Sequence, residues 1–123
     1  FGEENMIYEN ELITLEIESS EIPWVKVFTK RKIKEFSECS ADEKTEIFRV
    51  IDVTEKLMLD YFKADKINIA SFGNILPHVH WHIMARFETD SHFPDPMWGA
   101  KQREPQLDLP SFEVFFTELG EKL

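Results

Sequence analysis

The chain has little cysteine and no long apolar run. Its single cysteine, Cys39, has no partner for an intramolecular disulfide, and no Cys/His spacing suggests a structural zinc site. No stretch reaches the roughly 20 apolar residues of a membrane-spanning helix, and the first residues lack the basic and apolar blocks of a secretory signal. We therefore expect a cytoplasmic protein without a membrane partner.

Basic residues are also scarce. The sequence carries 24 acidic and 14 basic residues, a net charge of −10, which repels a nucleic acid backbone and argues against a nucleic acid polymer as partner. A small phosphorylated ligand remains compatible with this charge, because local positive charge can oppose the global field. The candidate cations are Lys30, Arg31, Lys32 and Lys34, which lie together, and Arg86.

Length and composition predict one domain over residues 1–123. A chain of this length with 42% apolar content can build a single core. We leave residues 1–5 out of the fold prediction, because Phe1 stands first instead of methionine and this end is either a foreign remnant or a processed terminus. Residues 88–110 are rich in proline and predict an irregular tail, a kind of segment that is usually functional in a compact domain.

The first half of the chain alternates between strand and helix patterns. Apolar alternation predicts a hairpin and then a further strand, over residues 6–9, 11–18 and 22–29. Ser40 and Glu43 form a capping box, in which each side chain binds a backbone amide of the first helical turn. Apolar residues at three- and four-residue steps then predict a long helix over about 41–63.

The second half predicts two more strands and a short helix. The extended stretches 66–72 and 75–87 are separated by Gly73-Asn74, a pair that favours a tight hairpin turn. Pro77 cannot donate to a β-ladder, so regular pairing is expected after it. An amphipathic helix over about 111–120 closes the chain.

Three of the four histidines lie within five residues, at His78, His80 and His82. They alternate with bulky apolar residues, which is a strand pattern of period two, so the three rings are expected on one face. Imidazole exchanges protons near neutral pH, and a strand face with three such rings is suited to chemistry. Trp81 belongs to the opposite, core-facing side, where its indole N–H needs a partner.

Three interpretations of these histidines remain at this point. A shared metal ion needs ligand atoms at about 2.0–2.1 Å, whereas His78 and His82 are about 13 Å apart along a straight strand, so His92, Asp90 or Asp95 would have to help. The rings could also be plain surface histidines on a half-buried strand. In the third interpretation one imidazole attacks phosphorus and its neighbour assists the proton transfer.

The sequence His78-Val79-His80-Trp81-His82-Ile83-Met84 resembles the signature of the histidine triad superfamily, His-φ-His-φ-His-φ-φ with φ apolar, at every position. The span from about Ile7 to Trp98 looks like the domain of that family, and residues 90–99 are similar to the tail of its small bacterial members. The resemblance implies an α+β fold with about five mostly antiparallel strands, one long helix over about 41–63 and a short C-terminal helix over about 111–120. It also implies a homodimer.

The same resemblance implies roles for single residues. His80 would be the nucleophile that forms a covalent nucleotidyl-histidine, His82 would contact the transferred phosphate or the leaving group, and His78 would orient His80 partly through its backbone carbonyl. Substrate binding would also involve Asn74, Asn68 and Trp98. Each has an alternative role: Asn74 as a turn residue, Asn68 in a structural contact, and Trp98 as an anchor of the tail. Many relatives carry a further histidine where this chain has Thr29-Lys30-Arg31-Lys32-Ile33. A lysine at that place can supply a positive charge, but unlike histidine it does not exchange protons near neutral pH.

The sequence thus favours a nucleotide hydrolase or nucleotidyl transferase acting at the α-phosphate of purine nucleoside derivatives, either dinucleoside polyphosphates or nucleoside phosphoramidates. No cofactor and no bound metal are expected, and the partner is a small-molecule nucleotide. A nucleotide-binding module with little turnover is the alternative from another class. A metal-dependent hydrolase is a third.

Overall fold

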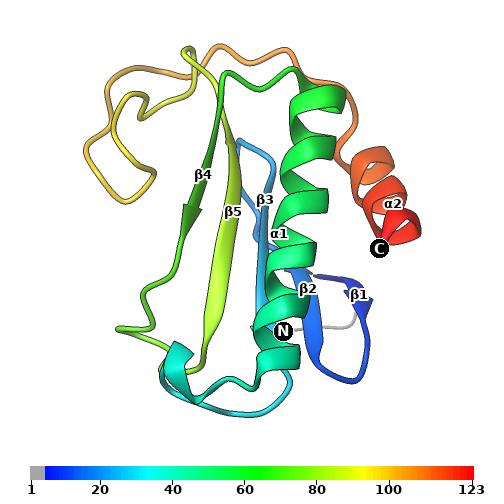
Figure 1. The fold of residues 1–123 in the computed structure, drawn as a ribbon. Helices are drawn as coiled ribbons and strands as arrows, with labels where there is room; N and C mark the ends of the chain where they lie inside the picture. The colour runs from blue at the N-terminus through cyan, green and yellow to red at the C-terminus, as the bar shows by residue number, and fades with distance from the viewer. Residues whose placement is uncertain (1–4) are drawn as a thin grey trace.

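The computed structural model describes residues 5–123, so the expectation for the first four residues lies outside them. The fold is α+β, with one antiparallel sheet of five strands in the order β1-β2-β3-β5-β4 and two helices (Figure 1). The strands are β1 (Met6–Glu9), β2 (Ile13–Ile17), β3 (Trp24–Thr29), β4 (Lys66–Ala70) and β5 (His80–Arg86). The helices are α1 (Ala41–Phe62), α2 (Phe112–Lys122) and a 3-10 turn, η2 (Phe36–Glu38). The predicted fold class is confirmed.

The long helix begins as its sequence predicts. The Ser40 Oγ accepts from the Glu43 amide at 3.1 Å, and the Glu43 carboxylate accepts from the Ser40 amide at 2.7 Å. Arg31 donates to both oxygens of Glu43, which is the main reason that the pKa of Glu43 is lowered to about 2. The helix ends where Lys63 adopts a left-handed conformation with φ of 56°.

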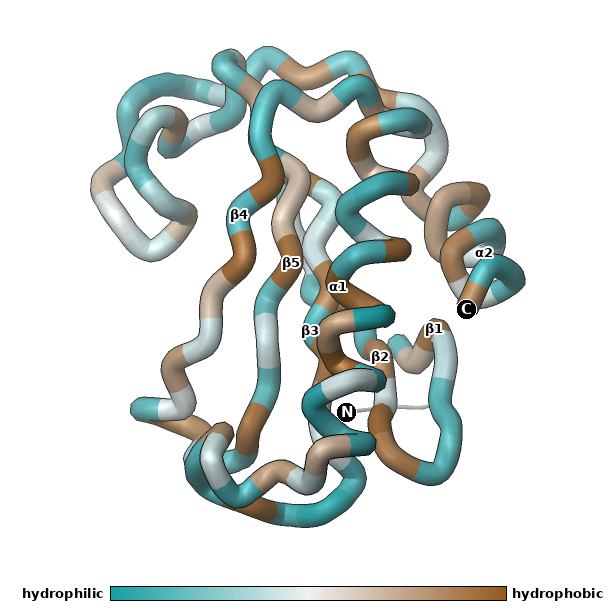
Figure 2. The backbone as a smooth tube through the Cα atoms, in the orientation of Figure 1, coloured by the Kyte–Doolittle hydropathy of each residue, from teal (hydrophilic) through white to brown (hydrophobic). Residues whose placement is uncertain are grey.

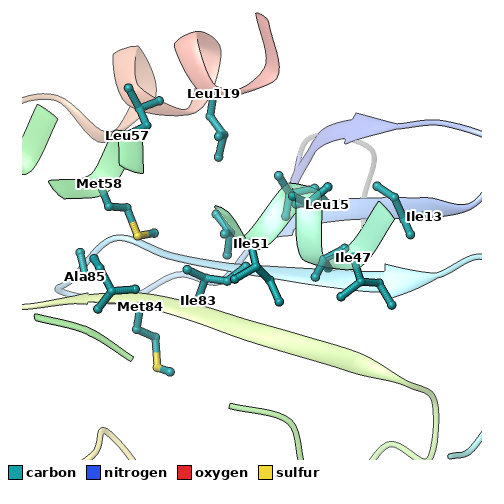
Figure 3. Packing of buried hydrophobic residues seen from close by; sticks show 14 of the residues in the cluster. Ile13, Leu15, Ile47, Ile51, Leu57, Met58, Ile83, Met84, Ala85 and Leu119 are labelled. Carbon is teal, nitrogen blue, oxygen red and sulfur yellow. The ribbon is translucent and has the colours of Figure 1, made fainter. Parts of the chain in front are cut away.

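The core lies between α1 and one face of the sheet. In Figure 3, Ile47 and Ile51 of α1 lie over the sheet near Ile83, whereas Met84 points to the opposite side of β5. Hydrophobic and hydrophilic residues follow each other turn by turn along α1 (Figure 2), as expected for a helix with one buried side. Each fully buried aliphatic side chain of this kind contributes about 1.5–3 kcal/mol before entropy losses. Within residues 5–123, no helix combines the length and the apolarity needed to cross a membrane.

The predicted tight turn at Gly73-Asn74 is wrong. Strand β4 ends at Ala70 and β5 begins at His80, so the two antiparallel strands are joined by an irregular connection over residues 71–79. The reason lies in the partner of this backbone, because the Val79 amide donates to the Ile33 carbonyl at 2.8 Å instead of pairing with β4. The connection therefore bends away from β4 and forms one side of the site described next.

Candidate active site

Two neighbouring strands present their even-numbered residues on the face of the sheet that α1 leaves uncovered, which we call the open face. In the register of β3 against β5, Phe28 lies opposite His80 and Lys26 lies opposite His82. Trp24 follows on the same side of β3, because side chains alternate along a strand. The histidines are thus flanked by an aromatic ring, a cation and an indole.

A cavity of about 440 Å³ lies over this part of the open face. His80 and His82 line it, and both are 8% exposed. Its other walls are aromatic side chains, the 73–76 part of the connection, and a Glu18–Lys26 ion pair at 3.3 Å. This combination of apolar walls and a few polar groups is typical of a small-molecule site.

The tautomer of the His80 ring is set by the backbone of His78. Nδ1 of His80 lies 2.6 Å from the carbonyl oxygen of His78, and a carbonyl can only accept, so Nδ1 carries the proton. The lone pair of a neutral ring is then on Nε2. Phe28 stacks on the ring at a centroid distance of 4.8 Å and holds its plane. His80 is therefore arranged as a nucleophile or base through Nε2.

His82 has the opposite arrangement. The indole Nε1 of Trp24 lies 3.0 Å from Nδ1 of His82, and because an indole only donates, Nδ1 must be unprotonated. The neutral ring therefore carries its proton on Nε2. Burial, followed by the nearby His80 and Lys26, lowers the pKa of His82 to about 4. The two catalytic candidates are in edge contact, with ring centroids 5.0 Å apart.

His78 lies outside β5, in the connection before it. Its Nε2 lies 2.6 Å from the carbonyl of Thr29, and its ring meets the edge of Phe28 at 5.4 Å. It lines a second cavity of about 310 Å³ beside the main one, together with Lys34. The side chain of His78 is therefore used for anchoring, while its carbonyl bonds to His80 as described above.

The three other predicted site residues are placed differently from one another. Asn74 and Trp98 line the main cavity, and Trp98 meets the edges of His82 and Phe72, each at a centroid distance of 4.9 Å. Asn68 instead accepts a hydrogen bond from Arg86 at 2.7 Å and lines a separate cavity of about 580 Å³ next to β4. The structure brings Asn74 and Trp98 to His80, and holds Asn68 in another contact.

Arg86 is buried beneath the tail and bound to it, contrary to its expected role as a cation for a phosphorylated ligand. It is 1% exposed and donates to both oxygens of Asp90, at 2.9 and 3.0 Å, and to the carbonyl of Asp95 at 2.7 Å. Burial alone would raise the pKa of Asp90, but Arg86 and two backbone amides outweigh it and lower the pKa to about 2. This ion pair fixes the tail that carries Trp98.

The basic cluster of the sequence is also dispersed. Lys30 forms an ion pair with Glu9 at 3.4 Å, and Arg31 is bound to Glu43. Lys34 lies nearer to the histidines, in the cavity that His78 lines. The positive charge beside His82 instead comes from Lys26, which lies directly opposite it on β3.

The groups suggested as metal ligands are engaged elsewhere. Nδ1 of His92 lies 2.7 Å from the Ser91 hydroxyl, and Asp90 is bound to Arg86. Across residues 5–123, no three His, Cys, Asp or Glu side chains are grouped in an arrangement that could hold a metal ion.

Trp24, Lys26 and Glu18 are site residues that the sequence reasoning missed. A signal was available, because the alternation of Trp24, Lys26 and Phe28 with valines places all three on one face of the predicted strand. The sequence does not reveal the pairing of β3 with β5, which places this face beside the histidines.

The sheet has five antiparallel strands, and β5, next to the edge strand β4, presents alternating histidines to a pocket. This arrangement defines the class of histidine triad proteins. The HIT domain family model matches residues 2–89, and the chain belongs to this family. Among functionally curated proteins, none matches the sequence.

Solved structures, two histidine triad proteins among them, are similar to nearly the whole of this chain. A protein from Sinorhizobium meliloti 1021 is 28% identical, with a TM-score of 0.76 and coverage of 98% of this chain and 92% of that one. One from Marinobacter aquaeolei VT8 is 23% identical, with a TM-score of 0.78 and the same two coverages, 98% and 92%. Plasmodium falciparum diadenosine triphosphate hydrolase is 16% identical, with a TM-score of 0.64 and coverage of 98% and 75%.

Proposed function

We propose that the protein is a nucleotide hydrolase or nucleotidyl transferase that acts at the α-phosphate of purine nucleoside derivatives. The observation that carries this proposal is the bond from Nδ1 of His80 to the His78 carbonyl, at 2.6 Å. It leaves the Nε2 lone pair of a largely buried imidazole for a ligand in the cavity. Family membership and the fold shared with a diadenosine triphosphate hydrolase support the general class of reaction.

The proposed reaction has two steps. Nε2 of His80 attacks the α-phosphorus, a P–N bond forms, and the bond to the leaving group breaks with its electron pair going to the leaving atom. Water then attacks the same phosphorus, a P–O bond forms, the P–N bond breaks, and its electrons return to Nε2. The proton that the water gives up leaves with the product phosphate and is released to solvent. The Nε2–H of His82 donates to phosphate oxygens, whose negative charge grows in both transition states.

The walls of the cavity suit a nucleoside. Phe72 and Trp98 are half-exposed aromatic rings at 4.9 Å from each other, and Leu76 adds an apolar surface on the same cavity. An aromatic wall stacks on a base of any sequence, and a purine offers more area than a pyrimidine. Asn74 adds an amide to the lining of the same cavity.

Intact-mass analysis tests the proposal directly. The protein is mixed with diadenosine triphosphate or adenosine phosphoramidate, in a His82→Gln background that slows hydrolysis of the intermediate. We expect an adenylyl adduct that maps to His80 by peptide sequencing and is absent in a His80→Ala control. A wild-type protein that binds AMP but turns over neither compound would support the binding module instead, and activity lost on chelation would support the metal-dependent hydrolase.

We also propose that the protein forms a homodimer, as its resemblance to the family implies. Strand β4 is an outer strand of the sheet, and its Ile69 is 41% exposed, a surface that a second copy would cover. Sedimentation equilibrium gives the test. A mass of one chain at micromolar concentration would refute the dimer.

A further inference from the structure

Trp24 stands out among the residues around the histidines, because its contact with His82 is a hydrogen bond and its position is fixed by packing. The indole donates to Nδ1 of His82 at 3.0 Å, while its ring meets the edge of Trp98 at a centroid distance of 5.3 Å. Trp24 belongs to β3, so its backbone is held in the sheet. A rigid donor thus faces one nitrogen of the histidine.

This donor excludes one protonation state of His82. If Nδ1 took up a proton, two N–H groups would face each other, because an indole has no acceptor. The bond would be lost, and the two N–H groups would both be left without a partner at this contact. The charged groups around His82 are Lys26 opposite it on β3, Glu18, which is paired with Lys26 at 3.3 Å, and the titratable His80 on the same strand. Lys26 adds to the cost of a second positive charge.

We infer that Trp24 is a positioning residue that keeps His82 a neutral Nε2–H donor, and that the site consequently cleaves phosphoanhydrides in preference to phosphoramidates. The inference rests on the proposed function and names its substrate class. In this state His82 can donate a hydrogen bond to a leaving group but cannot transfer a proton to it.

The two substrate classes differ in what the leaving atom needs. When His80 attacks a dinucleoside triphosphate, the α-phosphorus–oxygen bond breaks and the electron pair stays on a phosphate oxygen, which is stable as an anion because the second pKa of a phosphate monoester is about 6. A hydrogen bond from the Nε2–H of His82 is sufficient. When a P–N bond breaks, the nitrogen must take up a proton as it leaves, and a neutral imidazole is a poor acid for that transfer.

The first experiment observes the protonation directly. Two-bond ¹H–¹⁵N correlation spectra of the uniformly labelled wild-type protein assign the proton of His82 to Nδ1 or Nε2 between pH 5 and 8. We expect the Nε2–H form throughout. A protonated Nδ1, or titration of His82 near pH 6.5, would overturn the inference without any variant being needed.

The second experiment compares the two substrates. The kcat/KM values for diadenosine triphosphate and adenosine phosphoramidate are measured for the wild type and for Trp24→Phe, which keeps an aromatic ring but removes the donor. We expect the ratio of anhydride to amide to fall about tenfold, the size of one lost hydrogen bond, through faster phosphoramidate cleavage at acidic pH. The kcat/KM for the amide should then depend on pH with the pKa of the freed His82.

Trp98→Phe is the matched control, because Trp98 also meets the ring of His82, at 4.9 Å, through an edge contact. Its kcat/KM values should change for both substrates by the same factor, with the ratio and the His82 spectrum unchanged. A Trp24→Phe ratio equal to that of the wild type would overturn the inference while leaving the proposed function intact. A wild type that cleaves neither compound would overturn the proposed function and the substrate preference, with the protonation of His82 still decided by the spectra.

Discussion

The two faces of the sheet use the same two strands for different purposes. The odd-numbered residues of β3 and β5 lie against α1, where Val25, Val27 and Ile83 are fully buried. The even-numbered residues lie on the open face, and among them a lysine and two histidines line the cavity. On the helix side shape and volume determine the fit, whereas on the open side directed hydrogen bonds determine which nitrogen holds a proton. Neighbouring residues of one strand therefore serve different purposes: one side chain packs in the core, and the next lies at the candidate site.

The sharpest test of this separation pairs His80→Ala with Ile83→Ala on the same strand. His80→Ala should lower kcat by about 10⁴-fold or more, since it removes the proposed nucleophile, and should lower the free energy of unfolding by less than about 1.5 kcal/mol. Ile83→Ala should cost about 2–5 kcal/mol of stability and leave turnover per folded molecule within about threefold. Urea unfolding and active-site-normalised kinetics measure both. Equal effects of the two variants on stability would contradict the separation.

The next test compares two ion pairs of the same sequence spacing. Arg86→Met leaves Asp90 charged and buried, and should lower the free energy of unfolding by about 3–5 kcal/mol. Lys56→Met breaks an exposed pair with Asp52, at 2.9 Å, and should cost less than about 0.5 kcal/mol. Arg86→Met should also raise KM, because the tail with Trp98 loses its anchor. Thermal and urea unfolding of both variants provide the comparison, and similar losses would show that burial does not matter here.

His82 on the open face should also make the free energy of unfolding depend on pH. The pKa of His82 is lowered to about 4, so between about pH 6.5 and 4 the unfolded chain binds a proton at this residue that the folded chain does not. The stabilisation is complete above pH 6.5 and is lost as the pH falls to 4, by up to about 3 kcal/mol. Urea unfolding at pH 7, 5.5 and 4 measures it. His82→Gln should flatten this dependence, and an unchanged slope in that variant would assign the effect to other groups.

The smallest expected difference concerns two indoles, one on each face. Trp24 donates to His82, whereas Nε1 of Trp81 is buried without a hydrogen-bond partner among residues 5–123. Trp24→Phe loses a paired donor and should cost about 1 kcal/mol more stability than Trp81→Phe, which relieves an unpaired one. Both variants remove similar ring area, so each controls for the other. A larger loss for Trp81→Phe would mean that its ring packing against Phe36 outweighs the polar term.

The sequence predicted most of the fold because its signals were local. The capping box of Ser40 and Glu43 and the apolar stripe after it place α1 within one residue, and alternation places β1, β2 and β3. The turn at Gly73-Asn74 failed because the backbone of Val79 bonds to Ile33, which is distant in sequence. No local pattern reports such a contact.

For the site, too, the sequence predicts local spacing but not contacts between residues that are distant in sequence. The spacing of His80 and His82 follows from the strand period, and the two do lie together in the cavity. The burial of Arg86 could not be predicted, since it depends on the tail turning back so that the Asp95 carbonyl also accepts from its guanidinium. Trp24 could be placed on a face but not beside His82, because that requires the pairing of β3 with β5.

The anchor at the end of β5 has a consequence for ligand recognition. Arg86, four residues after His82, binds the tail to the strand that carries the histidines, so Trp98 of the cavity wall and the two histidines are held through one set of hydrogen bonds. A ligand that enters the cavity meets a wall already in place. The conformational entropy of ordering the tail is lost once, during folding, instead of at each encounter, and more of the contact energy appears as affinity.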